Sequence, residues 1–198
     1  MIRNIIFDFG AVLVDWDPHR VYVPYFGDEA RAEWFLTEIC PYSWNTQADR
    51  GRPLAEITQE RVDAFPEWEK EIRMYYDRWI EMMGDEIPGM RQLVSDYKSR
   101  GFGVYGLTNW SRETFPLVRD RYPVFGLLDG YVVSGEEMTM KPDPELFHIL
   151  LKRFGLQASE CVFVDDVPRN VEGALAVGMH GLLFHDAEQL REDLRRIL

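Results

Sequence analysis

Four short stretches of this sequence place polar side chains directly after apolar runs. They are Asp8-Phe9-Gly10, Thr108-Asn109, Lys141-Pro142 and Asp165-Asp166. Asp8 follows the run Ile5–Phe7 and has no neighbouring base in the sequence. A carboxylate in such a position is a candidate nucleophile, as in enzymes that form an aspartyl-phosphate. Phosphoryl transfer is therefore the first chemistry to consider for the other three stretches.

The remaining stretches supply what an anionic nucleophile needs in order to attack an anionic phosphate. Lys141 offers a positive charge, and Thr108 and Asn109 offer hydroxyl and amide donors for the phosphoryl oxygens. Asp165 and Asp166 are adjacent acids that repel each other unless a cation or a proton intervenes. Mg²⁺ prefers oxygen ligands and often binds one or two carboxylates together with substrate phosphate. Positioning and charge neutralisation are most of what phosphoryl transfer requires of a protein.

Each stretch taken alone has a simpler structural explanation. Asp8 and the Asp165-Asp166 pair could cap a helix or a turn, and Thr108-Asn109 could cap a helix that begins near Ser111. Lys141 could lie on a solvated loop, which is the usual place for a lysine. All four stretches at successive strand ends are much less expected by chance, so we favour one shared site.

Five short apolar runs alternate with helical patterns along the chain. The runs are residues 5–7, 103–107, 130–133, 161–164 and 181–184, and helices are predicted over 89–100, 144–154 and 170–177. This alternation indicates an α/β fold with a Rossmann-like, mostly parallel sheet covered by helices on both faces. Loops at the carboxyl ends of adjacent strands converge on one crevice, where the four stretches would meet.

Residues 18–86 interrupt the alternation. They are rich in Trp, Tyr, Glu and Arg, show no clear strand pattern and are too many for a structureless loop in a compact domain. We predict an inserted α-helical cap domain over residues 18–86 and a core domain made of residues 1–17 and 87–198. The cap should cover the crevice and contact the part of the substrate that leaves.

The four stretches resemble, in order and spacing, the motifs of the haloacid dehalogenase-like (HAD) hydrolase superfamily. The matching sequences are FDFGAVLVD, GLTNW, MKPDPELF and FVDDVPRNVEGA. The inserted segment resembles the helical cap that one branch of the superfamily carries after its first motif. The resemblance implies a Mg²⁺-dependent phosphatase for a small phosphorylated metabolite, similar to the small sugar-phosphate phosphatases of the glucose-1-phosphatase type. It implies hydrolysis through an aspartyl-phosphate intermediate.

The resemblance also implies roles for individual residues. The expected catalytic group consists of Asp8, Thr108, Asn109 and Lys141. The expected Mg²⁺ contacts are Asp8, the backbone carbonyl of Gly10, Asp165 and Asp166, with Asn170 orienting the last loop.

Substrate contacts are expected from residues 40–57, where aromatic, amide and charged side chains are mixed as sugar recognition requires. The residues suited to this are Trp44, Asn45, Asp49 and Arg50. The expected contacts are Trp44, Asn45 and Arg50, together with Trp110 as a wall of the pocket. Trp44 could equally pack between helices of the cap. A second aromatic group at helical spacing is interpreted as cap packing: Trp68, Tyr75, Tyr76 and Trp79.

Gly10 departs from the pattern of most phosphatases in the superfamily, which carry a second Asp at this position. Gly10 retains the carbonyl but lacks the carboxyl that protonates the leaving oxygen, and its simplest role is to permit a tight turn. Asp15, Asp17, His19 or a residue of the cap could supply the proton instead. Without such a residue, the rate should fall steeply as the pKa of the leaving group rises.

Gly10 also leaves two other functions open. In a metal-independent 2-haloacid dehalogenase, the aspartate attacks carbon and the displaced halide needs no proton. A catalytically weak binding module with the same fold is the third interpretation. The Asp165-Asp166 pair favours the phosphatase, because a metal-free dehalogenase has little use for two adjacent acids.

Charge and composition limit the partners. A net charge of −12 over 198 residues argues against nucleic acid, whose phosphates repel such a surface. No stretch approaches the ~18 apolar residues that a membrane span needs, and no secretory leader pattern opens the chain. With only two cysteines, a reducing cytoplasm is the expected compartment. We expect no membrane partner, and we allow for a homodimer.

Overall fold

The computed structural model describes all 198 residues and confirms the predicted α/β fold class. Five parallel strands form the central sheet in the order β5-β4-β1-β6-β7. They are β1 (Asn4–Phe7), β4 (Gly103–Thr108), β5 (Gly130–Val133), β6 (Cys161–Asp165) and β7 (His180–Leu183). In register, Ile6 of β1 lies opposite Tyr105 of β4 and Phe163 of β6. All five apolar runs are thus strands of one sheet.

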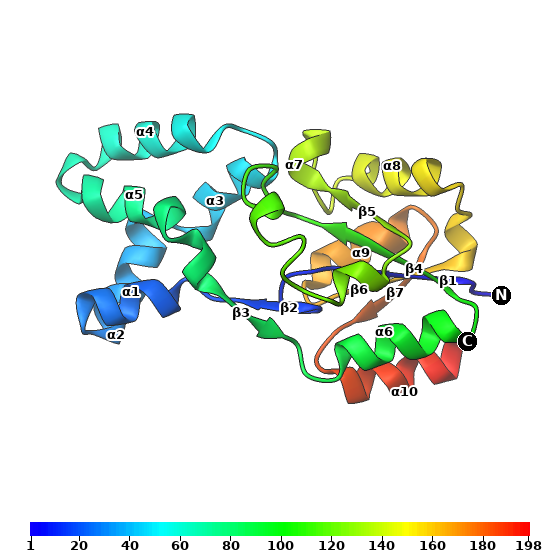
Figure 1. Cartoon of the computed structure of the whole chain (residues 1–198). Coiled ribbons are helices and arrows are strands. Elements are labelled where there is room, and N and C mark those ends of the chain that lie inside the picture. Colours follow the sequence, from blue (N-terminus) through cyan, green and yellow to red (C-terminus); the bar gives the residue numbers. More distant parts are fainter.

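Helices cover both faces of the sheet. Ile5 and Phe7 belong to the core under α6 (Met90–Ser99) and α10 (Ala187–Ile197). Ile6 faces the opposite way, into the core under α8 (Pro144–Phe154) and α9 (Pro168–Ala176). Figure 1 shows these two helix pairs on opposite sides of the strands. Successive side chains of a strand point to opposite faces, so a continuous apolar run buries both.

The segment between β2 (Val14–Trp16) and β3 (Met83–Glu86) forms a lobe of helices beside the sheet (Figure 1). Its α-helices are α1 (His19–Phe26), α2 (Glu29–Trp34), α3 (Tyr42–Asp49), α4 (Leu54–Ala64) and α5 (Glu69–Asp77). Shorter turns of π or 3-10 helix follow α2, α4 and α5 at Phe35–Ile39, Pro66–Trp68 and Trp79–Met82.

β3 corrects the expectation that residues 18–86 contain no strand. It pairs antiparallel with β2, outside the central sheet, and carries the sequence MGDE, which has no alternating apolar pattern. The pairing places Trp16 opposite Met83, so the chain leaves the sheet and returns to it along two adjacent strands.

The other short helical elements lie in the loops of the core. They are α7 (Ser134–Glu137) and the 3-10 turns Phe115–Leu117, Phe125–Leu127 and Ala158–Glu160. Cys40 and Cys161 are both buried and unpaired. None of the helices combines the length and the apolar character that crossing a membrane requires.

Candidate active site

Three neighbouring strands end in polar side chains at one edge of the sheet. Asp8 directly follows β1, Thr108 is the last residue of β4, and Asp165 is the last residue of β6. The strands are parallel, and β4 and β6 flank β1. The fold therefore brings these residues together at the carboxyl ends of the strands, where α/β sheets bind their ligands.

Lys141 lies between two of these carboxylates and is completely buried. Its Nζ is 2.8 Å from Asp8 Oδ1 and 2.7 Å from Asp165 Oδ2. The Asn109 side chain fixes the Lys141 backbone from both sides, because Oδ1 accepts from the Lys141 N–H at 2.8 Å and Nδ2 donates to the Lys141 carbonyl at 3.1 Å. Burial lowers the pKa of Lys141, but the charges of Asp165 and Asp8 outweigh it and raise that pKa overall. The buried lysine thus remains a cation.

Asp165 is held more tightly than Asp8. Its carboxylate accepts hydrogen bonds from Lys141 Nζ, from the Val167 N–H at 2.8 Å and, on both oxygens, from Asn170 Nδ2 at 3.1 Å. These bonds occupy both oxygens, so Asp165 fits a role that positions Lys141 and the loop before α9. Asn170 thus links α9 to Asp165, the last residue of β6.

Oxygen atoms suited to a metal ion surround Asp8. Carboxylate oxygens of Asp8, Asp165 and Asp166 all lie within 4.8 Å of one another. Asn170 Oδ1 is buried and has no hydrogen-bond donor. Burial raises the pKa of Asp8 to about 8, Lys141 opposes that rise, and Asp165 and Asp166 add to it. An all-oxygen donor set with excess negative charge fits Mg²⁺, and Asp8, Asp166 and the Gly10 carbonyl are the groups that would hold it.

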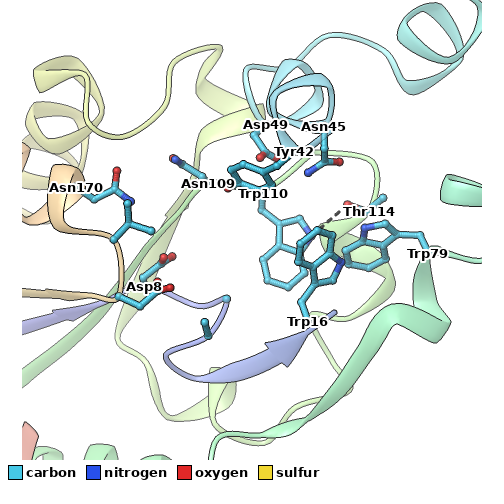
Figure 2. Close-up of a pocket in the computed structure, with 14 residues that line it drawn as sticks. Asp8, Trp16, Tyr42, Asn45, Asp49, Trp79, Asn109, Trp110, Thr114 and Asn170 are labelled. Atoms are coloured by element: carbon cyan, nitrogen blue, oxygen red, sulfur yellow. Dashed lines mark hydrogen bonds between the residues drawn. The ribbon is translucent and has the colours of Figure 1, made fainter. Parts of the chain in front are cut away.

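A cavity of about 250 Å³ opens at this sheet edge, between the core and the helical lobe (Figure 2). The core side of its lining includes Asp8, Gly10, Asn109, Trp110, Thr114, Asp166 and Asn170. The other side is formed by Trp16 of β2 and, from the lobe, Tyr42, Asn45, Asp49 and Trp79. The cavity therefore has an acidic floor at the sheet and a largely aromatic roof.

Two of the four predicted substrate contacts line this cavity, and two do not. Asn45 and Trp110 line it. Trp44 packs between lobe helices, with its ring 5.1 Å from that of Tyr75 and its Nε1–H donating to the Ile57 carbonyl at 3.1 Å. Arg50 points outward and pairs with Asp143 of the core at 2.9 Å. Trp44 therefore takes the packing position that the sequence equally allowed, and neither Trp44 nor Arg50 belongs to the lining of this cavity.

Thr108 lies outside the lining of the cavity. Its side chain is 1% exposed, and its hydroxyl oxygen has no hydrogen-bond partner in the protein. The cavity does not reach this hydroxyl, so the predicted contact of Thr108 with the phosphoryl group stays a prediction.

The aromatic roof went largely unrecognised in the sequence. Trp79, for which the sequence favours packing, is buried against Trp110 and also lines the cavity, as do Trp16 and Tyr42. Asn45 and Asp49 carried a usable signal: they are spaced four apart and so share one face of α3. That face is buried against the core, where a buried acid requires a reason.

The end of α3 and the start of α4 are both fixed to the core by hydrogen bonds. Ser134 Oγ donates to the Asp49 carbonyl at 2.6 Å, and Glu113 Oε1 accepts from the Leu54 N–H at 2.9 Å. Gly51 has φ +87°, and a Cβ there would lie 2.2 Å from Met138 Sδ and 2.8 Å from the Gly135 carbonyl. Only glycine allows this approach, so the roof is seated closely on the core.

Residues 2–178 match the sequence model of a protein family described as haloacid dehalogenase-like hydrolase. This chain belongs to that family. The match spans four of the five strands of the sheet, the lobe and all four motif stretches, and so confirms the resemblance drawn from them.

Curated relatives of this HAD-like hydrolase include phosphatases. A sesquiterpene phosphatase of Aspergillus oryzae is 36% identical over 109 residues, which cover 55% of this chain and 56% of the relative. A phosphorylated carbohydrates phosphatase of Thermotoga maritima is 23% identical over 179 residues, covering 90% and 82%. Across the first four curated relatives, the match covers between 19% and 56% of the relative's own length.

Solved structures share the whole fold of this HAD-like hydrolase. A HAD family enzyme of Bacteroides thetaiotaomicron, solved as a magnesium complex, superposes with a TM-score of 0.76 at 20% identity and covers 98% of each chain. A 2-haloacid dehalogenase of Pseudomonas syringae superposes with a TM-score of 0.61 at 20% identity over the full length of both chains. At such identities, the likeness establishes the fold alone.

Proposed function

We propose that this HAD-like hydrolase is a Mg²⁺-dependent phosphatase that cleaves a small phosphorylated metabolite through an aspartyl-phosphate on Asp8. The observation that carries the proposal is the floor of the cavity. There Asp8 lies 2.8 Å from a buried lysine and within 4.8 Å of two further carboxylates. The phosphatases among its relatives support the same reaction class.

The floor residues divide the work. Asp8 attacks phosphorus, and Lys141 holds its carboxylate in place and offers positive charge to the phosphoryl oxygens. Asn109 fixes Lys141 through the backbone, and Asp165 fixes it through the side chain. A bound Mg²⁺ would neutralise charge on the phosphoryl group. Water then cleaves the aspartyl-phosphate and restores Asp8.

The helical lobe, proposed as a cap domain over residues 18–86, would contact the leaving group and so determine which substrates bind. Asn45 and Asp49 offer polar atoms, and the aromatic rings of Trp79 and Trp110 line the cavity, packed edge to face with their centres 5.6 Å apart. Aromatic faces with a few polar groups suit a sugar phosphate, which is the substrate class we favour. The same faces suit an apolar alcohol such as that of a terpene phosphate, so both belong in a substrate screen.

A 2-haloacid dehalogenase is the second candidate, favoured by the absence of a carboxyl at Gly10. Against it, the cluster of three acids has no use in a reaction without metal. The third interpretation is a catalytically weak binding module, which measurable turnover of an aryl phosphate, abolished in Asp8→Asn, would exclude.

The decisive experiment is a screen of aryl, sugar, acyl and terpene phosphates and 2-haloacids, each with Mg²⁺ and with excess EDTA. We expect phosphate release that requires Mg²⁺ and falls by roughly 10⁴-fold or more in Asp8→Asn, because the nucleophile is lost. Thermal unfolding of Asp8→Asn controls for misfolding. Halide release undiminished by EDTA would establish the dehalogenase instead, and no turnover of any compound would favour the binding module.

A further inference from the structure

The backbone does not require a glycine at position 10. Gly10 does not adopt a left-handed φ, and a Cβ built on it meets no atom within 4 Å. A carboxyl-bearing side chain would therefore find open space at this point of the lining. If leaving-group protonation matters, some other residue of the cavity has to supply it.

The nearby acids and the histidine in the sequence are occupied elsewhere. Asp15 is paired with Arg20. His19 lies 2.8 Å from Asp17 through Nδ1 and 2.8 Å from Glu33 through Nε2. None of these residues lines the cavity. They stabilise the entry to the lobe and are not placed to reach a substrate.

Asp49 is the one acid that faces the cavity from the lobe. The acids of the lining are Asp8, Asp166 and Asp49, and the first two belong to the floor. Asp49 is 4% exposed, and no group of the protein donates a hydrogen bond to its carboxyl oxygens, although Ser134 bonds its backbone carbonyl. Figure 2 shows its carboxyl on the roof side of the cavity, across from that of Asp8.

The surroundings of Asp49 keep a proton on it near neutral pH. The charged and titratable groups that face it are Lys141 from the core, Tyr42 from its own helix, and Tyr75 and Tyr76 from α5. Burial raises the pKa of Asp49 to about 7, and only the charge of Lys141 opposes that rise. An acid of this strength is suited to both giving and taking a proton at neutral pH.

In-line displacement fixes where a proton is needed. The attacking and leaving oxygens lie on opposite sides of phosphorus. With Asp8 on the floor, the leaving oxygen points toward the roof, and the water of the second step has to approach from the roof as well. Asp49 is the acid on that side.

We infer that Asp49 is the general acid and base of this enzyme, in place of the carboxyl that Gly10 lacks. The inference rests on the proposed phosphatase function. In the first step the Asp8 oxygen forms a bond to phosphorus, the ester P–O bond breaks, and the leaving oxygen takes the Asp49 proton. In the second step the Asp49 carboxylate takes a proton from water, whose oxygen bonds to phosphorus as the Asp8–phosphorus bond breaks. Phosphate leaves, and both aspartates are restored.

The test compares Asp49→Asn with the unmodified enzyme on an aryl phosphate, whose phenolate leaves without a proton, and on an alkyl phosphate. We expect kcat to fall by about 10²-fold or more on the alkyl ester and by only a few-fold on the aryl ester, given that general acid catalysis contributes roughly 10²–10⁴-fold. The fall in kcat/KM above about pH 7 on the alkyl ester should disappear in the variant. Asp17→Asn, a nearby acid outside the cavity, is the matched control and should behave as the unmodified enzyme.

Adding Gly10→Asp to Asp49→Asn should restore much of the lost rate on the alkyl ester, because a carboxyl then returns to the floor. Asp49→Ser serves as a second variant and should give the same split between the esters. Equal losses on both esters, or no loss on the alkyl ester, would overturn the role of Asp49. No turnover by the unmodified enzyme on either ester would instead overturn the proposed function.

Discussion

The floor and the roof of the cavity differ in whether their buried carboxyls have a cationic partner. On the floor, Lys141 bonds Asp8 at 2.8 Å and Asp165 at 2.7 Å, so charges are held in fixed pairs. On the roof, Asp49 has no cationic partner in contact and is surrounded by aromatic side chains. A cation in contact favours the ionised form of a carboxyl, and burial favours the protonated form. Lys141 contacts Asp8 and opposes the effect of burial there, and a bound Mg²⁺ would add to it, whereas Asp49 has no cation in contact. Two aspartates on facing walls thus acquire different chemistry from their neighbours alone.

Removing the cation of the floor should have the largest effect on stability. Lys141→Met leaves Asp8 and Asp165 buried without their partner, which should cost about 3–5 kcal/mol of unfolding free energy. Denaturant titration in EDTA measures this loss. The double variant Lys141→Met/Asp165→Asn, with one buried acid fewer, should recover part of the stability and none of the activity. A single variant as stable as the unmodified protein would contradict the pairing described for the floor.

Asp49 on the roof should make the free energy of unfolding depend on pH. Asp49 has a raised pKa of about 7 in the fold, so its contribution is fully present below its unfolded pKa of about 4 and is lost as pH rises through 7. Asp49→Asn removes that dependence. Between about pH 5.5 and about pH 8, the unmodified protein should lose about 2 kcal/mol relative to the variant.

Urea titration of both proteins at the two pH values gives the difference directly. Contributions shared by both proteins, such as that of Asp8, cancel in the comparison. Parallel pH profiles for the two proteins would show that Asp49 is not a protonated acid in the fold.

The smallest expected effects distinguish a residue that lines the cavity, Asn45, from one on the outer surface of the lobe, Arg50. Asn45→Ala should lower kcat/KM by about tenfold, because it removes polar atoms from the cavity. Arg50→Ala should change kcat/KM by less than about twofold and stability by less than about 1 kcal/mol, since its pair with Asp143 is exposed. Steady-state kinetics on one substrate compares the two. If Arg50→Ala lowered kcat/KM as much as Asn45→Ala does, Arg50 would have to contact the substrate.

The sequence predicted the floor better than the roof, for a physical reason. Asp8, Asp165 and their partners each follow a strand, and parallel strands bring their carboxyl ends to one edge by construction. The apolar runs therefore predict both the strands of the sheet and the place where the reactive side chains meet. β3 is not predicted because MGDE has no strand pattern, and its strand geometry comes from pairing with the distant β2.

The roof depends on how separate helices pack, which no local pattern records. Trp44 and Trp79 look alike in the sequence, yet Trp44 packs between helices and Trp79 faces the cavity. Asp49 and Arg50 are consecutive residues at the end of α3, yet Asp49 is buried and Arg50 points outward. Only the spacing of Asn45 and Asp49 on α3 hinted at the inward face.

The pairing of β2 with β3 has a consequence for how such enzymes diversify. Because Trp16 lies opposite Met83, the two ends of the intervening chain are neighbours. A segment of another length or shape can be exchanged there without stretching any connection of the sheet, and closing a longer excursion costs little extra entropy. Descendants of one ancestor can therefore inherit the reactive aspartate unchanged and acquire new selectivity by replacing a single contiguous stretch of gene.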